Sequence, residues 1–203
     1  MSLAVVHSRA LSGIDAPPVT VEVHLSNGLP GLSIVGLPET EVKESRDRVR
    51  SALLTANFEF PARRITVNLA PADLPKEGGR FDLPIALGVL AASGQVPVAA
   101  LHDVEFLGEL ALTGQLRSVR GALTAALAAR TAQRSLMLPA INADEAALAD
   151  GATVYAAGHL LDVTAHLHAS AKLTTHQLTT QVVIEPGPDL GEVRGQQQAK
   201  RAL

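Results

Sequence analysis

The spacing of the hydrophobic residues changes along the chain, and this change limits the possible folds more than any other feature. Residues 19–25 alternate apolar and polar side chains, as a half-buried strand does. Together with strand-like residues 3–6 and 32–36, and with a Gly/Pro turn before the last of these, the pattern predicts an antiparallel meander. Beyond residue 104, short strands and helical segments alternate instead. A meander followed by such an alternation indicates an α+β fold.

The other elements are predicted from the same periodicities and from signals at their ends. A helix is expected from Pro38 to about Asn57, because proline suits the first turn of a helix. Residues 83–94 predict a second helix that is apolar on all sides and therefore buried, with Asp82 as a candidate cap. Further strands are expected at 64–70, 104–112 (one bent strand or a pair), 135–139 and 152–157, and further helices at 119–133, 143–149 and 158–168.

The composition restricts how such a chain can bury a core or hold nucleic acid. Hydrophobic residues make up 47% of the 203 positions, but only five are aromatic, whereas alanine occurs 33 times. The core is therefore expected to be aliphatic, and bases have almost no aromatic side chains on which to stack. A net charge of −3 gives no overall attraction to nucleic acid, so binding of that kind must be local.

Cysteine is absent from the sequence, which excludes disulfides, thiolate metal sites and a cysteine nucleophile. Its apolar runs are far shorter than the roughly 20 residues that a membrane helix needs. The first 25 residues lack the basic start and apolar block of a signal peptide. These features predict a cytoplasmic protein without a membrane partner.

The chain divides into three parts by composition. Residues 1–168 carry the periodic segments, and residues 169–184 are expected to form a linker because they begin with a Thr/Ser/Gln-rich stretch of little periodicity. Residues 185–203 begin with a Pro/Gly turn and run into an amphipathic helical pattern that is cut off at Leu203. This last part is expected to be the start of a second domain in a longer protein.

Familiar catalytic and metal-binding motifs are missing. Neither G-x-x-x-x-G-K-[ST] nor G-x-G-x-x-G occurs in the sequence. Glycine-rich residues 77–80 follow a strand and precede a helix, so they form either an anion-binding loop or a loop that needs unusual backbone angles. His166 and His168 have no carboxylate at a spacing that would complete a metal site, so no metal is expected.

Basic residues gather on the predicted helix that begins at Pro38. Lys43, Arg46 and Arg50 fall along one flank of its apolar stripe, and Arg48 falls on the other. Acidic residues are interleaved with them, and Glu39–Lys43 and Glu44–Arg48 have the spacing of ion pairs within a helix. A solvated, self-paired face is favoured over a nucleic-acid site.

Three long strings resemble one protein family. They are VEVHLSNGLPGLSIVGLPETEVKESRDRVRSAL (21–53), FPARRITVNLAPADLPKEGGRFDLPIALGVLAASG (60–94) and LGELALTGQLRSVRGAL (107–123). Residues 3–168 are thereby similar to the amino-terminal domain of the ComM/YifB family of magnesium-chelatase-like AAA+ proteins. The tail, DLGEVRGQQQAKRAL (189–203), resembles the opening of that family's AAA+ module.

This resemblance implies a homo-hexameric ATPase that acts on DNA, with ATP and magnesium as cofactors of the full-length protein and none in this fragment. The activity implied is branch migration, a helicase function, in natural transformation and recombination. On the same ground Asp189, Val193 and Gln196 would belong to the adenine side of the nucleotide site in the longer protein. The resemblance also implies a fold like that of the Lon protease domain, a β-α sandwich shared with domain 2 of a ribosomal protein.

Comparison with the Lon motifs predicts that peptidase chemistry is lost. Arg80 stands where Lon proteases have their nucleophilic serine, and Leu123 stands where they have their lysine. Arginine stays protonated and leucine has no basic group, so no catalytic residue is expected. The basic side chains of these two segments would instead converge on the former cleft and contact DNA: Lys76, Arg80, Arg117 and Arg120. In the alternative interpretation, Arg80 pairs with Glu77 or Asp82 and only shapes the loop.

The leading hypothesis is therefore a non-catalytic accessory domain of a AAA+ motor. Two other classes remain open: a peptidase-like hydrolase with an unrecognised active site, and a chelatase-like subunit.

Overall fold

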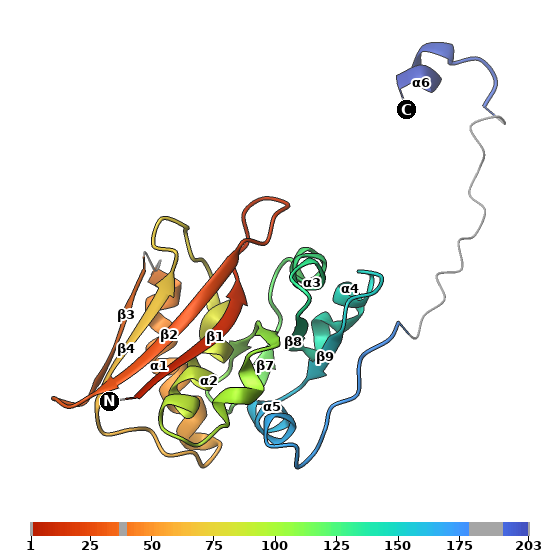
Figure 1. Ribbon diagram of the computed structural model, residues 1–203. Coiled ribbons are helices and arrows are strands. Elements are labelled where there is room, and N and C mark those ends of the chain that lie inside the picture. The colour runs from red at the N-terminus through yellow and green to blue at the C-terminus, as the bar shows by residue number, and fades with distance from the viewer. Residues whose placement is uncertain (1, 37–39, 179–192, 203) are drawn as a thin grey trace.

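The computed structural model describes residues 2–36, 40–178 and 193–202. Its main feature is a seven-stranded sheet with the strand order β3-β4-β2-β1-β5-β8-β9, shown in Figure 1. Four of its strand pairings are parallel (β1–β5, β3–β4, β5–β8 and β8–β9), and two are antiparallel (β1–β2 and β2–β4). The fold is thus mixed α and β with a mostly parallel sheet.

The first half of the sheet departs from the predicted meander. β1 (Ser2–Arg9) and β2 (Pro18–Ser26) form the expected antiparallel hairpin. β3 (Gly31–Val35), however, pairs in parallel with β4 (Arg64–Ala70), which lies between β3 and β2. The helix α1 (Thr40–Thr55) connects β3 to β4. A helical crossover returns the chain in the same direction, so two strands joined in this way become parallel neighbours.

The second half contains the predicted alternation of strands and helices. Its parallel strands are β5 (Val104–Phe106), β8 (Ser135–Pro139) and β9 (Val154–Ala157), and its helices are α3 (Ala122–Thr131), α4 (Ala143–Ala147) and α5 (Leu160–Leu167). The segment predicted as a bent strand or strand pair over 104–112 is split. β5 joins the large sheet, whereas β6 (Glu109–Leu110) forms a separate two-stranded ribbon with β7 (Leu116–Arg117).

The core is aliphatic, as predicted, and α2 (Asp82–Ala92) lies at its centre with every residue buried. This helix packs against β1, β2 and α1. A Cβ atom at Gly88 would lie 2.4 Å from Cγ2 of Val23, so the close approach of helix and sheet requires glycine there. Despite the apolar character of α2, the described residues include no helix that is both long and apolar enough to cross a membrane.

Short 3₁₀ turns connect several elements: η1 (Gly79–Phe81), η2 (Val98–Leu101) and η3 (Ala140–Asn142). Near the end of the chain, α6 (Gln197–Ala202) forms within the amphipathic tail.

The first part of the predicted linker contacts the domain. Thr175 forms an antiparallel bridge with Tyr155 of β9, so the chain follows the edge of the sheet. The backbone N–H of Leu173 donates to Nδ1 of His166 at 2.9 Å, and Nε2 of His176 lies 2.7 Å from Oδ1 of Asp144. Residues 170–178, here called the strap, are therefore tied to the domain. The sequence missed these contacts because their partners belong to earlier elements.

Candidate functional site

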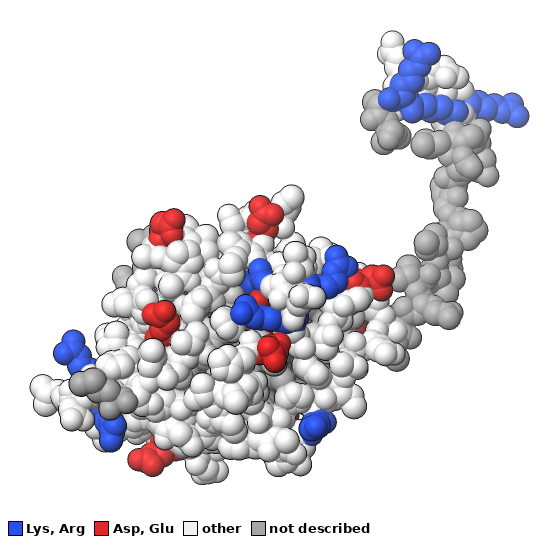
Figure 2. Space-filling model, in the orientation of Figure 1, with Lys and Arg blue, Asp and Glu red and all other residues white. Residues whose placement is uncertain are grey.

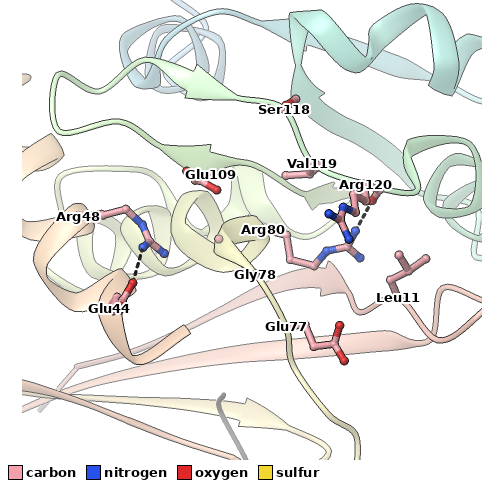
Figure 3. A pocket seen from close by; sticks show the side chains of 11 residues that line it. Leu11, Glu44, Arg48, Glu77, Gly78, Arg80, Glu109, Ser118, Val119 and Arg120 are labelled. Atoms are coloured by element: carbon pink, nitrogen blue, oxygen red, sulfur yellow. Dashed lines mark hydrogen bonds and ion pairs between the residues drawn. The ribbon is translucent and has the colours of Figure 1, made fainter. Parts of the chain in front are cut away.

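A recess of about 570 Å³ lies where five segments of the chain meet, and Figure 3 shows its lining. α1 contributes Glu44 and Arg48, and the loop that leads into η1 contributes Glu77 to Arg80. The other side is formed by Glu109 of β6 and by residues 118–120, which follow β7. Leu11, from the connection between β1 and β2, completes the wall.

The buried carboxylate of Asp82 links the elements at one end of the recess. Asp82 is fully buried, and its Oδ2 accepts from Nε of Arg48 at 2.7 Å and from the backbone N–H of Leu110 at 3.1 Å. Oδ1 accepts from Nη2 of Arg48 at 3.1 Å and from the hydroxyl of Ser45. Burial raises the pKa of Asp82, and the hydrogen bonds from Arg48 and Ser45 act against that rise. The carboxylate thus links α1, α2 and β6.

This arrangement corrects one prediction and confirms another. Asp82 was a candidate cap, but Phe81 occupies the cap position of α2, where no side chain caps the helix. The Asp82 carboxylate serves the partners on α1 and β6 instead. Of the two pairs predicted for the first helix, Glu44–Arg48 is confirmed, since Nη1 of Arg48 lies 3.6 Å from Oε2 of Glu44. The other, Glu39–Lys43, includes Glu39, which lies outside the described residues. The hydrogen bond to Asp82 raises the pKa of Arg48.

Arg80 lies at the opposite end and is only 6% exposed. Its Nη1 donates to the backbone carbonyl of Arg9 at 3.3 Å, and its Nη2 donates to the carbonyl of Arg120. Among the described residues no carboxylate forms a hydrogen bond or ion pair with this guanidinium. The alternative interpretation, in which Arg80 pairs with Glu77 or Asp82, is therefore not supported by a direct contact. Burial lowers the pKa of Arg80, and the negative charge of Glu77 opposes this effect.

The four basic side chains predicted to converge do not all line the recess. Arg80 and Arg120 do, and they lie at the same end of it. Lys76 is fully buried, and its ammonium group donates to the carbonyl of Pro71, so it is not displayed to a ligand. Burial also lowers the pKa of Lys76. Arg117 lies outside the lining, with 62% of its side chain exposed and Nη1 3.5 Å from Oε1 of Glu109.

Charges of both signs therefore surround the recess. Figure 2 shows basic and acidic side chains next to one another over the centre of the visible face, with no broad patch of one sign. The lining itself contains three arginines and three glutamates: Arg48, Arg80, Arg120, Glu44, Glu77 and Glu109.

The other candidate residues lie away from this recess. His166 accepts from the strap and packs its ring 4.7 Å from that of Tyr155, while Nε2 of His168 lies 2.9 Å from the carbonyl oxygen of Gln95. No group of three potential ligands that could hold a metal occurs among the described residues. Leu123 is partly buried on α3.

The residues proposed for the nucleotide are only partly described. Asp189 lies outside the described residues, Val193 is 42% exposed, and Gln196 is exposed. The backbone carbonyl of Val193 accepts from the ammonium group of Lys200 in the following helix. These described residues alone do not build a site that fits ATP and magnesium, because they include no phosphate-binding loop.

Sequence reasoning missed several residues of the recess, above all Glu109 and Leu11. It identified the Gly-rich loop and Arg120, but no local signal connects Arg48 with Asp82, which lies 34 residues later. Only packing of α1 against the start of α2 brings these two together.

Comparison with known proteins identifies the family of this chain. The family model described as subunit ChlI of Mg-chelatase matches residues 21–142. The competence protein ComM of Haemophilus influenzae is 56% identical over the whole chain, and the protein YifB of Escherichia coli is 52% identical over the whole chain. The chain belongs to the ComM/YifB family of magnesium-chelatase-like proteins. It spans 41% and 40% of the lengths of these two relatives.

A more distant similarity involves a protease. Lon protease 2 of Thermus thermophilus is 30% identical over 133 residues, which cover 60% of this chain and 16% of that protein. The ChlI family model and this partial match fit the mixed α and β architecture described above.

Proposed function

We propose that this chain is a non-catalytic accessory domain of a AAA+ ATPase that acts on DNA. The observation that supports this most directly is the engagement of Arg80, which binds two backbone carbonyls at the loop position where Lon proteases have their nucleophile. A guanidinium held in this way anchors two chain segments, whereas a nucleophile must be free to attack a carbonyl. Membership of a family with a competence protein supports the link to DNA uptake and recombination.

The fold proposed here is that of the Lon protease domain, related to domain 2 of a ribosomal protein. The partial match to a Lon protease supports it, as does the position of the Gly-rich loop between β4 and α2. Leu123, at the position of the Lon lysine, is partly buried and cannot accept a proton. In this proposal the hydroxyl and the amine of a Ser-Lys dyad are replaced by the side chains of Arg80 and Leu123, which serve the structure.

DNA contact is proposed through Arg117, Arg120 and, within the recess, Arg80. Arg117 is largely exposed, and Arg120 is exposed beside the same wall. Lys76 is removed from this set because its ammonium group is buried. Acidic neighbours weaken each contact, so useful affinity would come from repetition around a homo-hexamer. ATP and magnesium would be held by the AAA+ module of a longer protein.

The experiment uses the longer protein that contains this chain. We expect DNA to stimulate its ATPase activity, and we expect Arg117→Ala/Arg120→Ala to weaken that stimulation. The slope of log affinity for DNA against log salt concentration should also fall in magnitude by about one unit per lost phosphate contact. Arg46→Ala is a matched control because Arg46 is exposed and pairs only with Asp47 among the described residues. Equal DNA affinity and salt slope in the double variant would contradict DNA binding here.

The purified 203-residue chain is also tested for peptide and ester hydrolysis. We expect no turnover. Hydrolysis that disappears in Arg80→Met but not in Arg46→Ala would instead support the peptidase-like alternative.

A further inference from the structure

Arg80 carries a buried positive charge that no hydrogen-bonded carboxylate neutralises. Its partners for hydrogen bonds are the carbonyl oxygens of Arg9 and Arg120, which carry no net charge. Burial of an ionised group is costly unless an opposite charge compensates it. The buried Arg9, by contrast, is compensated, since its Nε lies 2.5 Å from Oε2 of the buried Glu105.

The neighbouring charges leave this end of the recess positive. Arg48 serves two carboxylates, Glu44 and Asp82, and Glu109 is paired with Arg117, so the charges around the whole recess balance. At the end that Arg80 lines, the charged side chains are Arg80, Arg120 and Glu77. Within the described part of the chain, the side chains of Arg120 and Glu77 form no hydrogen bond or ion pair. Two guanidinium groups against one carboxylate give this end a local excess of one positive charge.

The shape of the recess restricts what can supply that counter-ion. Its volume of about 570 Å³ is within the range of small-molecule sites. Arg80 forms part of its wall and is only 6% exposed, so a ligand must enter the recess to reach it. A nucleic-acid backbone that continues in both directions lies along a surface, whereas the end of a strand can enter. A terminal phosphate monoester also carries about two negative charges at neutral pH, and an internal phosphodiester carries one.

We propose that this recess binds a terminal phosphate monoester, with Arg80 as the inner ligand and Arg120 at the entrance. The phosphate belongs either to the end of a DNA strand or to a free nucleotide, which share this chemistry. Arginine suits it because its planar donors match phosphate oxygens in pairs. The inference rests on the proposed function in so far as the strand end is the source.

The test measures binding of a short single-stranded oligonucleotide to the 203-residue chain by fluorescence anisotropy. The same sequence is used with a 5′-phosphate and with a 5′-hydroxyl, and adenosine monophosphate, adenosine and inorganic phosphate serve as competitors. We expect the phosphorylated strand to bind about tenfold more tightly, as charge-assisted hydrogen bonds are lost with the phosphate. Adenosine monophosphate should compete, and adenosine should not.

Three variants assign the effect to the recess. Arg120→Ala is expected to abolish most of the preference for the phosphorylated end. Glu77→Gln should strengthen binding of that end about two- to fivefold, because it removes the opposing charge at almost constant volume. Arg46→Ala, which removes an equal charge from an exposed part of α1, should leave the preference unchanged. These substitutions avoid Arg80, whose loss could disturb folding.

The outcomes separate this inference from the proposed function. Equal binding of both oligonucleotides, without competition by adenosine monophosphate, overturns the phosphate recess but leaves DNA binding in place. Direct binding of adenosine monophosphate, measured by isothermal titration calorimetry and lost in Arg120→Ala, together with no binding of either oligonucleotide, supports the recess with a free nucleotide as its ligand and counts against DNA. A preference that survives in Arg120→Ala and does not increase in Glu77→Gln overturns the assignment to this recess.

Discussion

The two ends of the recess hold an arginine in opposite ways. Arg48 meets the buried carboxylate of Asp82 at 2.7 Å, and its charge is compensated within the protein. Arg80 donates hydrogen bonds only to carbonyl oxygens, so no hydrogen-bonded carboxylate compensates its charge. A compensated pair fixes elements relative to one another, whereas an uncompensated charge in an open recess is available to a ligand. The comparison therefore separates a structural end from a binding end.

The largest expected effect is at the structural end. Asp82→Ala removes the carboxylate that accepts from Arg48, Ser45 and the Leu110 N–H, leaving four donor groups of three residues without this acceptor. We expect a loss of about 3 kcal/mol in the free energy of unfolding, measured by urea denaturation.

Asp47→Ala is the matched control, because its partner Arg46 and its own side chain are exposed. It should unfold at the same urea concentration as the parent chain. If the two variants were equally stable, Asp82 would not have the structural role described here.

A smaller effect is expected at the binding end. Arg80→Met keeps much of the side-chain volume but leaves the carbonyls of Arg9 and Arg120 without this donor. We expect a loss of about 1–2 kcal/mol by the same denaturation, because the variant also removes the cost of an uncompensated charge. A loss as large as that of Asp82→Ala would remove the distinction between the two ends.

The smallest effect concerns His166, where the strap is attached. His166 Nδ1 accepts from the Leu173 N–H, and burial lowers the pKa of His166, assisted by the charge of Lys172. The folded state thus binds its proton less readily than the unfolded state. Stability from this contact is present above the usual histidine pKa of about 6.5 and is lost as the pH falls through the lowered value.

We therefore expect faster opening of the strap at acidic pH, measured as decreased protection of the Leu173 amide in hydrogen exchange after correction for intrinsic rates. His166→Phe should remove this pH dependence, whereas His168→Phe should keep it, since His168 contacts Gln95 and not the strap. Protection that stays constant across this pH range in the parent chain would contradict the assignment.

Features set by near neighbours in sequence could be predicted. Alternation at residues 19–25 predicted β2, and the fully apolar segment after Asp82 predicted the buried α2. The Glu44–Arg48 pair follows from helical spacing alone. The prediction that Lys76 joins a basic surface cluster was wrong, because Lys76 is buried. The pattern of charges shows which residues are basic but not which of them the fold encloses.

By itself, the sequence determined the periodicity of the strands and helices, the aliphatic core and the family to which the chain belongs. Tertiary structure alone decided that β4 lies between β3 and β2, that Lys76 is buried, and that Asp82 compensates Arg48 but not Arg80. The physical reason is range. Side-chain periodicity is a property of neighbouring residues, whereas burial and the compensation of a charge depend on segments that meet only when the chain is folded.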